Sequence, residues 1–261
     1  MENYANNIRD AVRKNYSKVA ENYSLYSGCG CAPNSTFTFK QISSELGYSE
    51  KELNNVPEGS NMGLGCGNPQ AIASLKKGET VLDLGSGAGF DAFLAANQVG
   101  EKGKVIGVDM TPKMITKAKI NAVKGNYTNV EFRLGEIENL PVKDKVIDVI
   151  ISNCVINLSP EKHKVFNDAF RVLNSGGRLA VSDVVATTEL PEEIKNDMEL
   201  YSGCVSGAST IDEIEIMLKT AGFVNIEIKP KDESKKFIRE WAPGTKISDY
   251  IISASIEAIK P

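Results

Sequence analysis

Residues 81–91 read Val81-Leu82-Asp83-Leu84-Gly85-Ser86-Gly87-Ala88-Gly89-Phe90-Asp91, and this stretch decides the fold. Apolar residues predict a buried strand that ends at Leu84, and a glycine-rich turn then opens a helix predicted over 89–98. The glycines allow the backbone to pass close to a ligand at the carboxyl end of the strand, where open α/β sheets bind their ligands. The stretch therefore predicts the first strand and first crossover of a ligand-binding α/β sheet.

On either side of this stretch, strand patterns alternate with helix patterns. Predicted strands cover 80–84, 104–109, 130–134, 146–152 and 178–185, and predicted helices cover 89–98, 112–124 and 160–173. This alternation is typical of a doubly wound, mostly parallel sheet with helices on both faces. After a predicted amphipathic helix over 211–221, two strand patterns over 224–229 and 247–258 indicate that the sheet ends in antiparallel strands.

The N-terminal part follows a different pattern. Ile8, Val12 and Tyr16 recur at helical spacing and predict a helix over residues 1 to about 27. Asn68 followed by Pro69 predicts the start of another helix, which runs to about residue 77. We expect residues 1–68 to form a helix and cysteine-containing loops that cover the substrate site, and residues 69–261 to form the α/β domain, with substrate-site elements over about 186–246.

Composition excludes several classes of function. The chain has 261 residues, 41% of them hydrophobic, and a net charge of −4, so it lacks the basic surface that nucleic acids or anionic membranes require. No apolar run approaches the roughly 20 residues of a membrane helix, and the N-terminus lacks a secretory pattern. We therefore expect a cytoplasmic protein with neither a nucleic acid nor a membrane as partner.

The cysteine and histidine counts restrict the chemistry further. Five cysteines, an odd number, argue against a disulfide framework and favour metal binding, redox work or buried thiols. The single histidine, His163, excludes most zinc-hydrolase and Ser-His-Asp mechanisms, and we expect it to lie on the surface.

The charge at the glycine-rich turn indicates which ligand it binds. Its pattern is G-x-G-x-G, whereas the dinucleotide fingerprint is G-x-G-x-x-G. Asp83 stands just before the first glycine, where a carboxylate repels a pyrophosphate but attracts a cation. S-adenosylmethionine carries a sulfonium and an ammonium group, so the sequence predicts that Asp83, Gly85, Ser86 and Gly87 bind this methyl donor.

Polar residues after the next strands extend the same site. Asp109, followed by Met110, ends the second strand and is placed to accept hydrogen bonds from ribose hydroxyls. Glu136 follows the third strand and could accept from the adenine amino group, with Ile137 against the ring, and we expect Asn153 beside the cofactor. A single loop acid would be an ordinary surface carboxylate, but an ordered set after successive strands favours a cofactor site.

Three cysteines are candidates for the acceptor site. Cys154 follows the fourth strand, where amine methyltransferases usually carry Asp/Asn-Pro-Pro-aromatic, and Cys204 follows the fifth. Cys66 lies in a glycine-rich loop near a predicted helix start, which would lower its pKa. Three thiolates suit a soft trigonal centre such as arsenic(III), whereas zinc usually needs a fourth ligand. Buried cysteines often act only as small hydrophobic residues, which is the alternative for each of them.

Residues from about 80 to 185 resemble class I methyltransferases, notably the branch with ubiquinone and menaquinone C-methyltransferases. The resemblance implies a seven-stranded sheet with an antiparallel last strand and a cofactor surrounded by the residues matching Asp83, Gly85, Gly87, Asp109 and Glu136.

A closer resemblance covers most of the chain. Residues 62–69, 83–91, 152–158, 202–205 and 240–244 are similar to the corresponding motifs of arsenite methyltransferases. This resemblance implies that Cys66, Cys154 and Cys204 hold arsenic, that arsenite or an arsenic–thiol conjugate is the substrate in arsenic detoxification, and that a thiol reductant such as thioredoxin or glutathione resets the enzyme. It also implies an accessory redox role for Cys29 and Cys31, for which two incidental loop thiols are the alternative.

Two other functions stay open at this point. A carbon methyltransferase acting on a quinone-like or other apolar molecule would not need the cysteines for turnover. A metalloid-binding sensor or buffer would bind arsenic without methylating it, although the complete set of acidic residues argues against that function.

Overall fold

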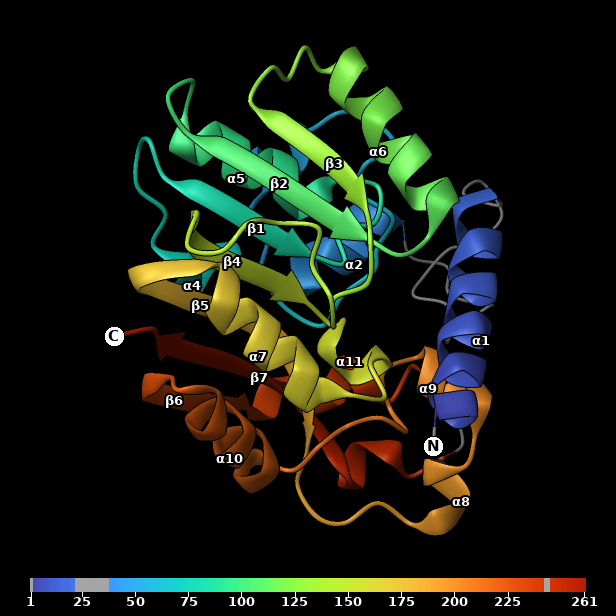
Figure 1. The fold of residues 1–261 in the computed structure, drawn as a ribbon. Coiled ribbons are helices and arrows are strands. Elements are labelled where there is room, and N and C mark those ends of the chain that lie inside the picture. Colours follow the sequence, from blue (N-terminus) through green and yellow to red (C-terminus); the bar gives the residue numbers. More distant parts are fainter. Residues whose placement is uncertain (1, 22–37, 242–244) are drawn as a thin grey trace.

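The computed structural model describes residues 2–21, 38–241 and 245–261, and a seven-stranded sheet forms its centre (Figure 1). The strands are β1 (Thr80–Leu84), β2 (Lys104–Asp109), β3 (Val130–Leu134), β4 (Ile147–Asn153), β5 (Leu173–Ala186), β6 (Val224–Lys231) and β7 (Ile251–Ile259). Their order in the sheet is β3-β2-β1-β4-β5-β7-β6. The first five are mutually parallel, and β7 lies antiparallel between β5 and β6. The predicted mostly parallel sheet with an antiparallel end is confirmed.

Helices cover both faces of the sheet because successive residues of each strand point to opposite sides. Val81 packs in one apolar cluster with residues of α4 (Gln70–Ala73), α5 (Phe90–Val99) and α6 (Pro112–Lys124). Leu82, the next residue, packs in another cluster with α7 (Lys162–Val172) and α10 (Ile211–Ala221). Burial on both faces explains the continuous apolar runs in the central strands.

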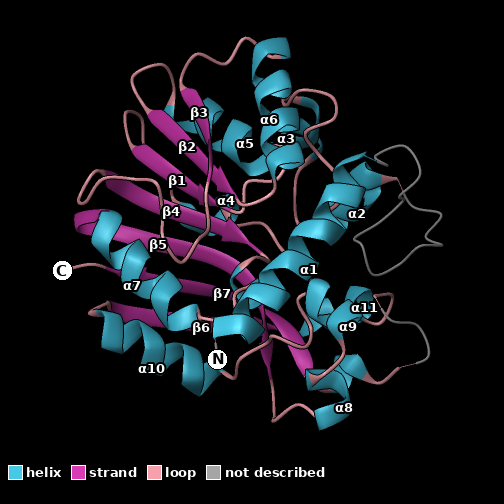
Figure 2. Cartoon of the chain, turned by 45° about the vertical axis from the view of Figure 1, so that its right-hand side comes forward, coloured by secondary structure: helices cyan, strands magenta, loops and turns pink. Residues whose placement is uncertain are grey.

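The N-terminal elements lie at the carboxyl ends of the parallel strands. The helix α1 (Glu2–Glu21) stands across these ends and contacts α6 and α9 (Met198–Ser202), as Figures 1 and 2 show. Two short helices, α2 (Phe39–Glu45) and α3 (Glu50–Asn54), follow, and each begins with a capping box. In this arrangement α1 lies next to any ligand that binds at the strand ends.

Short elements complete the same end of the molecule. They are η1 (Ile156–Leu158), α8 (Glu192–Lys195), η2 (Asp232–Ser234), α11 (Lys235–Ile238) and η3 (Ile247–Asp249). No helix in the described ranges has the length and apolar character needed to cross a membrane.

Three predicted boundaries are wrong, and one of them is the start of β5, which lies at Leu173 and not at residue 178. The helix expected from Pro69 to residue 77 is only the four-residue α4, because Ser74 adopts a left-handed conformation with φ 46° and ends it. The last strand does not begin at Ile247, since residues 247–249 form the 3-10 turn η3 and β7 starts at Ile251. Of the helix predicted over 1–27, residues 2–21 are helical, and the remainder, with Cys29 and Cys31, lies outside the described residues.

Candidate active site

A single cavity runs from the glycine-rich turn to the cysteine-bearing loops. It lies where β1, β2 and β4 end, and Arg9, Val12 and Tyr16 of α1 line its opposite side. The residues predicted to bind the cofactor or the acceptor that line it are Asp83, Gly85, Ser86, Gly87, Asp109, Met110, Ile137, Asn153, Cys154 and Cys204. Residues predicted for the donor and for the acceptor therefore line one cavity.

Acidic side chains that pair with no cation among the described residues form one wall. Asp83 is 2% exposed, and its Oδ2 atom has no hydrogen-bond partner among the described residues. Burial, and then the nearby charges of Asp91 and Asp109, raise the pKa of Asp83 well above its usual range. Burial also raises the pKa of Asp91 to about 6, although three side chains donate hydrogen bonds to it. A cationic ligand would offset this desolvation, so the wall fits the sulfonium and ammonium groups of S-adenosylmethionine.

The turn itself leaves space for a nucleoside. Gly87 has φ 51°, and a Cβ atom there would meet no atom within 4 Å. Its amide donates to Asp109 Oδ2 at 3.0 Å, while the amide of Thr111 donates to Oδ1 at 2.8 Å. These bonds hold the Asp109 carboxylate at the rim, and the buried Ser86 Oγ has no partner in the described structure. The orphaned oxygen and the open turn fit a ribose-bearing ligand.

Glu136 occupies a different position from the one we expected. Its carboxylate lies 3.1 Å from Arg13 Nη2 and 3.7 Å from Arg9 Nε, and its side chain is 40% exposed. It does not line the cavity, whereas its neighbours Ile137 and Glu138 do. The contact of Glu136 with adenine stays a prediction. In the structure, Glu136 forms ion pairs with the arginines of α1.

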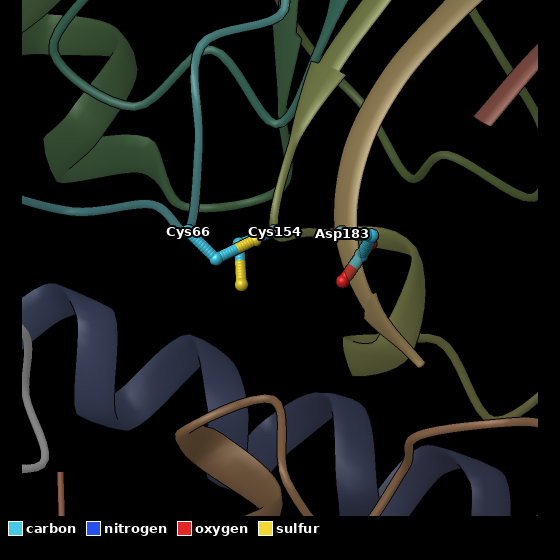
Figure 3. A group of neighbouring side chains, drawn as sticks. All are labelled: Cys66, Cys154 and Asp183. Atoms are coloured by element: carbon cyan, nitrogen blue, oxygen red, sulfur yellow. The ribbon is translucent and has the colours of Figure 1, made fainter. Parts of the chain in front are cut away.

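Three cysteines lie beside the far end of the cavity, which Cys154 and Cys204 line and Cys66 does not. Cys66, Cys154 and Cys204 are buried and form no disulfide. The thiol of Cys154 interacts with both of the other thiols. The Sγ atoms of Cys66 and Cys154 and a carboxylate oxygen of Asp183 all lie within 4.8 Å of one another, and Figure 3 shows the two sulfurs side by side with Asp183 beside them on β5. Residues from three separate loops and strands thus surround one small volume.

Backbone bonds and close contacts position the first two thiols. The Cys66 amide donates to Asn153 Oδ1 at 3.0 Å, and its carbonyl accepts from Ser253 Oγ at 2.7 Å. A Cβ atom on Gly67 would lie 2.1 Å from Ser182 Oγ, so only glycine lets this loop approach β5. The Cys154 amide donates to the Ser182 carbonyl at 2.8 Å.

The prediction that a helix N-terminus lowers the pKa of Cys66 is wrong. Burial raises its pKa, because desolvation of a thiolate in the apolar cluster around it outweighs the favourable contacts. For Cys154, the contact with Cys204 lowers the pKa, but the contact with Cys66 and burial outweigh it, and the result lies well above the usual range. Without a ligand these two groups are therefore thiols.

Several residues of the site were not predicted. Arg9, Asp91 and Trp241 line the cavity, Tyr48 lies behind it with its hydroxyl on Asp91, and Asp183 lies beside the thiols. Asp91 belongs to the glycine-rich stretch, and its position in the first turn of α5 was a usable signal. Arg9, Tyr48 and Asp183 come from distant parts of the chain and carry no recognisable motif.

A doubly wound sheet of order 3-2-1-4-5-7-6, with an acid-lined cavity at its strand ends, defines the class I methyltransferase fold. Residues 75–222 match the methyltransferase-domain family, and the chain belongs to this family.

Named relatives are more specific. The chain is 50% identical to an arsenite methyltransferase of Halobacterium salinarum, over 97% of this chain and 66% of that protein. It is 37% identical to an arsenite methyltransferase of Aquipseudomonas alcaligenes, over 84% of this chain and 62% of that protein. The chain therefore spans just under two thirds of the length of these relatives. The crystal structure of an arsenic(III) S-adenosylmethionine methyltransferase from Chlamydomonas reinhardtii superposes with a TM-score of 0.64 at 32% identity, over 84% of this chain and 73% of that one.

Proposed function

We propose that this chain transfers methyl groups from S-adenosylmethionine to arsenic(III) bound by Cys66, Cys154 and Cys204. The observation that carries the proposal is that three buried thiols lie together beside one end of a cavity whose other end is lined by acidic side chains, of which Asp83 has an unpartnered oxygen. The similarity to arsenite methyltransferases supports it independently.

Loading of arsenic uses the thiols in their protonated form. Each Cys–SH replaces one hydroxyl of arsenious acid, so an As–S bond forms, an As–O bond breaks, and the thiol proton leaves with the hydroxyl as water. Three exchanges release three waters and need no external base. This balance agrees with the raised pKa values of Cys66 and Cys154 and with a surface His163 that is remote from the chemistry in the described chain.

S-adenosylmethionine supplies an electrophilic methyl group on a sulfonium. A trigonal arsenic with three sulfur ligands keeps one lone pair, which forms the As–C bond while the methyl–sulfonium bond breaks and its electron pair stays on the departing thioether. The contribution of the protein is alignment of the two partners, which is the main source of rate in such a displacement. The apolar cluster around the thiols, with α1 across it, keeps water away from both partners.

The transfer leaves arsenic formally pentavalent. Return to the trivalent state takes two electrons, which two thiols supply by forming a disulfide. A thiol reductant of the thioredoxin or glutathione class then restores the thiols. We keep the accessory redox role of Cys29 and Cys31 as a prediction, since both lie outside the described residues.

The test is incubation with arsenite, methyl-labelled S-adenosylmethionine and a thiol, followed by separation of the arsenic species. We expect labelled methylarsenicals, and a loss of about a hundredfold or more in rate for Cys66→Ser, Cys154→Ser and Cys204→Ser singly. Ser206→Ala is the matched control, since it removes a buried hydroxyl near Cys204 that donates only to the Asp197 carbonyl. Unlabelled arsenic together with a labelled quinone would instead favour carbon methylation, and arsenite binding without methylated product would favour a sensor.

A further inference from the structure

A buried tyrosine hydroxyl connects the two ends of the cavity. Tyr48 is 3% exposed and lies between α2 and α3, outside the set of residues that line the cavity. Its hydroxyl donates to Asp91 Oδ1 at 2.7 Å and accepts from Asn153 Nδ2 at 3.0 Å. Its ring packs on Phe90, a cavity residue, with the centroids 4.8 Å apart. Tyr48 therefore touches the donor wall on one side and Asn153 on the other.

Asn153 carries the connection to the first thiol. Its Oδ1 accepts the amide of Cys66 at 3.0 Å, and its Nδ2 donates to the Gly67 carbonyl at 2.8 Å. A Cβ atom on Gly65 would lie 2.7 Å from the Asn153 amide, so the loop lies directly against this side chain. The orientation of the Asn153 amide thus determines where the Cys66 loop sits.

The amide of Asn153 has more acceptors than hydrogens. Nδ2 has two hydrogens, and three oxygens lie within reach: the Gly67 carbonyl, the Tyr48 hydroxyl and, at 3.3 Å, Asp91 Oδ2. The Tyr48 hydroxyl donates its proton to Asp91, so a lone pair of its oxygen is free to accept a hydrogen from Asn153 Nδ2. This bond fixes the direction of one of the two amide hydrogens. The segment around Tyr48 is also attached to the loop directly, since Asn68 Nδ2 donates to the Gly47 carbonyl at 3.1 Å.

We propose that Tyr48 is a positioning residue that transmits occupancy of the methyl-donor site to the Cys66 loop. A cationic donor in the cavity lies against the Asp91 carboxylate and orders it, and this carboxylate accepts a short, charge-assisted bond from the Tyr48 hydroxyl. That bond orients the Tyr48 lone pair toward Asn153, and the ordered amide holds the Cys66 backbone. Donor binding therefore orders in advance a loop that arsenic binding must otherwise order.

This inference rests on the proposed function for the identity of the acceptor, and its consequence is reciprocal coupling between the two ligands. S-adenosylhomocysteine, which cannot transfer a methyl group, occupies the donor site in the test. Arsenite is titrated with and without it, and the fluorescence of Trp241 reports binding, because Trp241 is the only tryptophan and lines the cavity. We expect S-adenosylhomocysteine to tighten arsenite binding about fivefold or more in the parent protein.

Tyr48→Phe removes only the hydroxyl and should bring this coupling factor close to one. Tyr127→Phe is the matched control, because its hydroxyl also makes side-chain hydrogen bonds, to Asn97 and the Asn55 carbonyl, but lies away from the cavity. It should keep the parent coupling. Parent-like coupling in Tyr48→Phe, or no coupling in the parent protein, would overturn the proposal.

A second measurement needs no variant and therefore does not depend on the folding of Tyr48→Phe. Hydrogen exchange of the amides in residues 61–69 should slow several-fold when S-adenosylhomocysteine binds to the unmodified protein. Unchanged exchange would contradict the link between donor site and loop. Because arsenite is absent from this measurement, its result does not depend on the proposed acceptor. Failure of arsenite to bind or to be methylated would count against the proposed function alone.

Discussion

Cys204 Sγ donates a hydrogen bond to the carbonyl oxygen of Cys154 at 2.8 Å, and both residues lie in the left-handed region of backbone space. Their φ angles are 58° for Cys154 and 64° for Cys204, a conformation that side chains other than glycine, asparagine and aspartate rarely adopt. Two of the three thiols thus sit on strained backbone, which is typical of functional sites.

This strain predicts that two variants of Cys154 differ in stability although both lose activity. Cys154→Gly should be about 1 kcal/mol more stable than Cys154→Ala, because glycine adopts φ 58° without a Cβ penalty. Both variants should lose arsenite methylation, since both lack the thiol. Urea denaturation of the pair measures the difference, and equal midpoints for Gly and Ala would show that the backbone carries no strain there.

Asp83 should limit stability while it supports cofactor binding. In Asp83→Asn the buried carboxylate with an unpartnered Oδ2 becomes neutral, so the ligand-free protein should melt several degrees higher. Binding of S-adenosylhomocysteine should weaken about tenfold or more, because the amide no longer attracts the ammonium group. Thermal melts and calorimetric titration test both halves, and a variant that is less stable yet binds normally would contradict this role.

The ligand-free protein should lose stability as the pH rises from 5 to 7.5. Asp91 has a folded-state pKa raised to about 6, so the folded protein holds a proton that the unfolded chain has already released. The stabilisation is complete below the unfolded pKa, near 3.8, and is lost as the pH passes through 6, which gives about 1 kcal/mol over this interval. Asp183, whose pKa burial also raises to about 6, adds a loss in the same window.

Burial also raises the pKa values of Asp83 and Asp109, which add to the same loss. Asp91→Asn should therefore remove about 1 kcal/mol of this pH dependence in urea denaturation at the two pH values. Glu131 and Glu161 do not interfere, because hydrogen bonds from Arg133 and Lys164, respectively, lower their pKa values to about 2, and their contribution disappears only in more acidic solution. If Asp91→Asn kept the full difference in unfolding free energy between the two pH values, other groups would be its source.

The helix α1 should depend on one arginine. Arg9, whose side chain is 11% exposed, pairs with Glu138 at 3.1 Å and Glu161 at 2.6 Å, and it lines the cavity. Arg9→Ala leaves the buried Glu138 without this partner and should cost about 2 kcal/mol. Because α1 closes the cavity, affinity for S-adenosylhomocysteine should fall as well.

Arg13 provides the matched control on the same helix. It pairs with Asp10 and Glu136, but these side chains are much more exposed, so Arg13→Ala should cost well under about 1 kcal/mol. Hydrogen exchange along residues 4–21 distinguishes the two variants. Similar protection of α1 in Arg9→Ala and in the parent would refute the anchoring role of Arg9.

The sequence by itself determined the sheet and the donor turn. Strand periodicity, the G-x-G-x-G stretch and the acid before it are local signals, and the structure agrees with them at Asp83, Gly87 and Asp109. The three cysteines were also identifiable, since each stands in a short motif next to a predicted strand or glycine-rich loop.

Only the tertiary structure decided how these residues act. The pKa of Cys66 depends on desolvation by a cluster drawn from distant elements, so the local helix rule predicted the wrong direction. Glu136 forms ion pairs with arginines of α1. Tyr48 forms hydrogen bonds with Asp91 and Asn153, which lie 43 and 105 residues away in the sequence. Hydrogen bonds and burial between such remote positions arise from packing in three dimensions, which no pattern of neighbouring residues encodes.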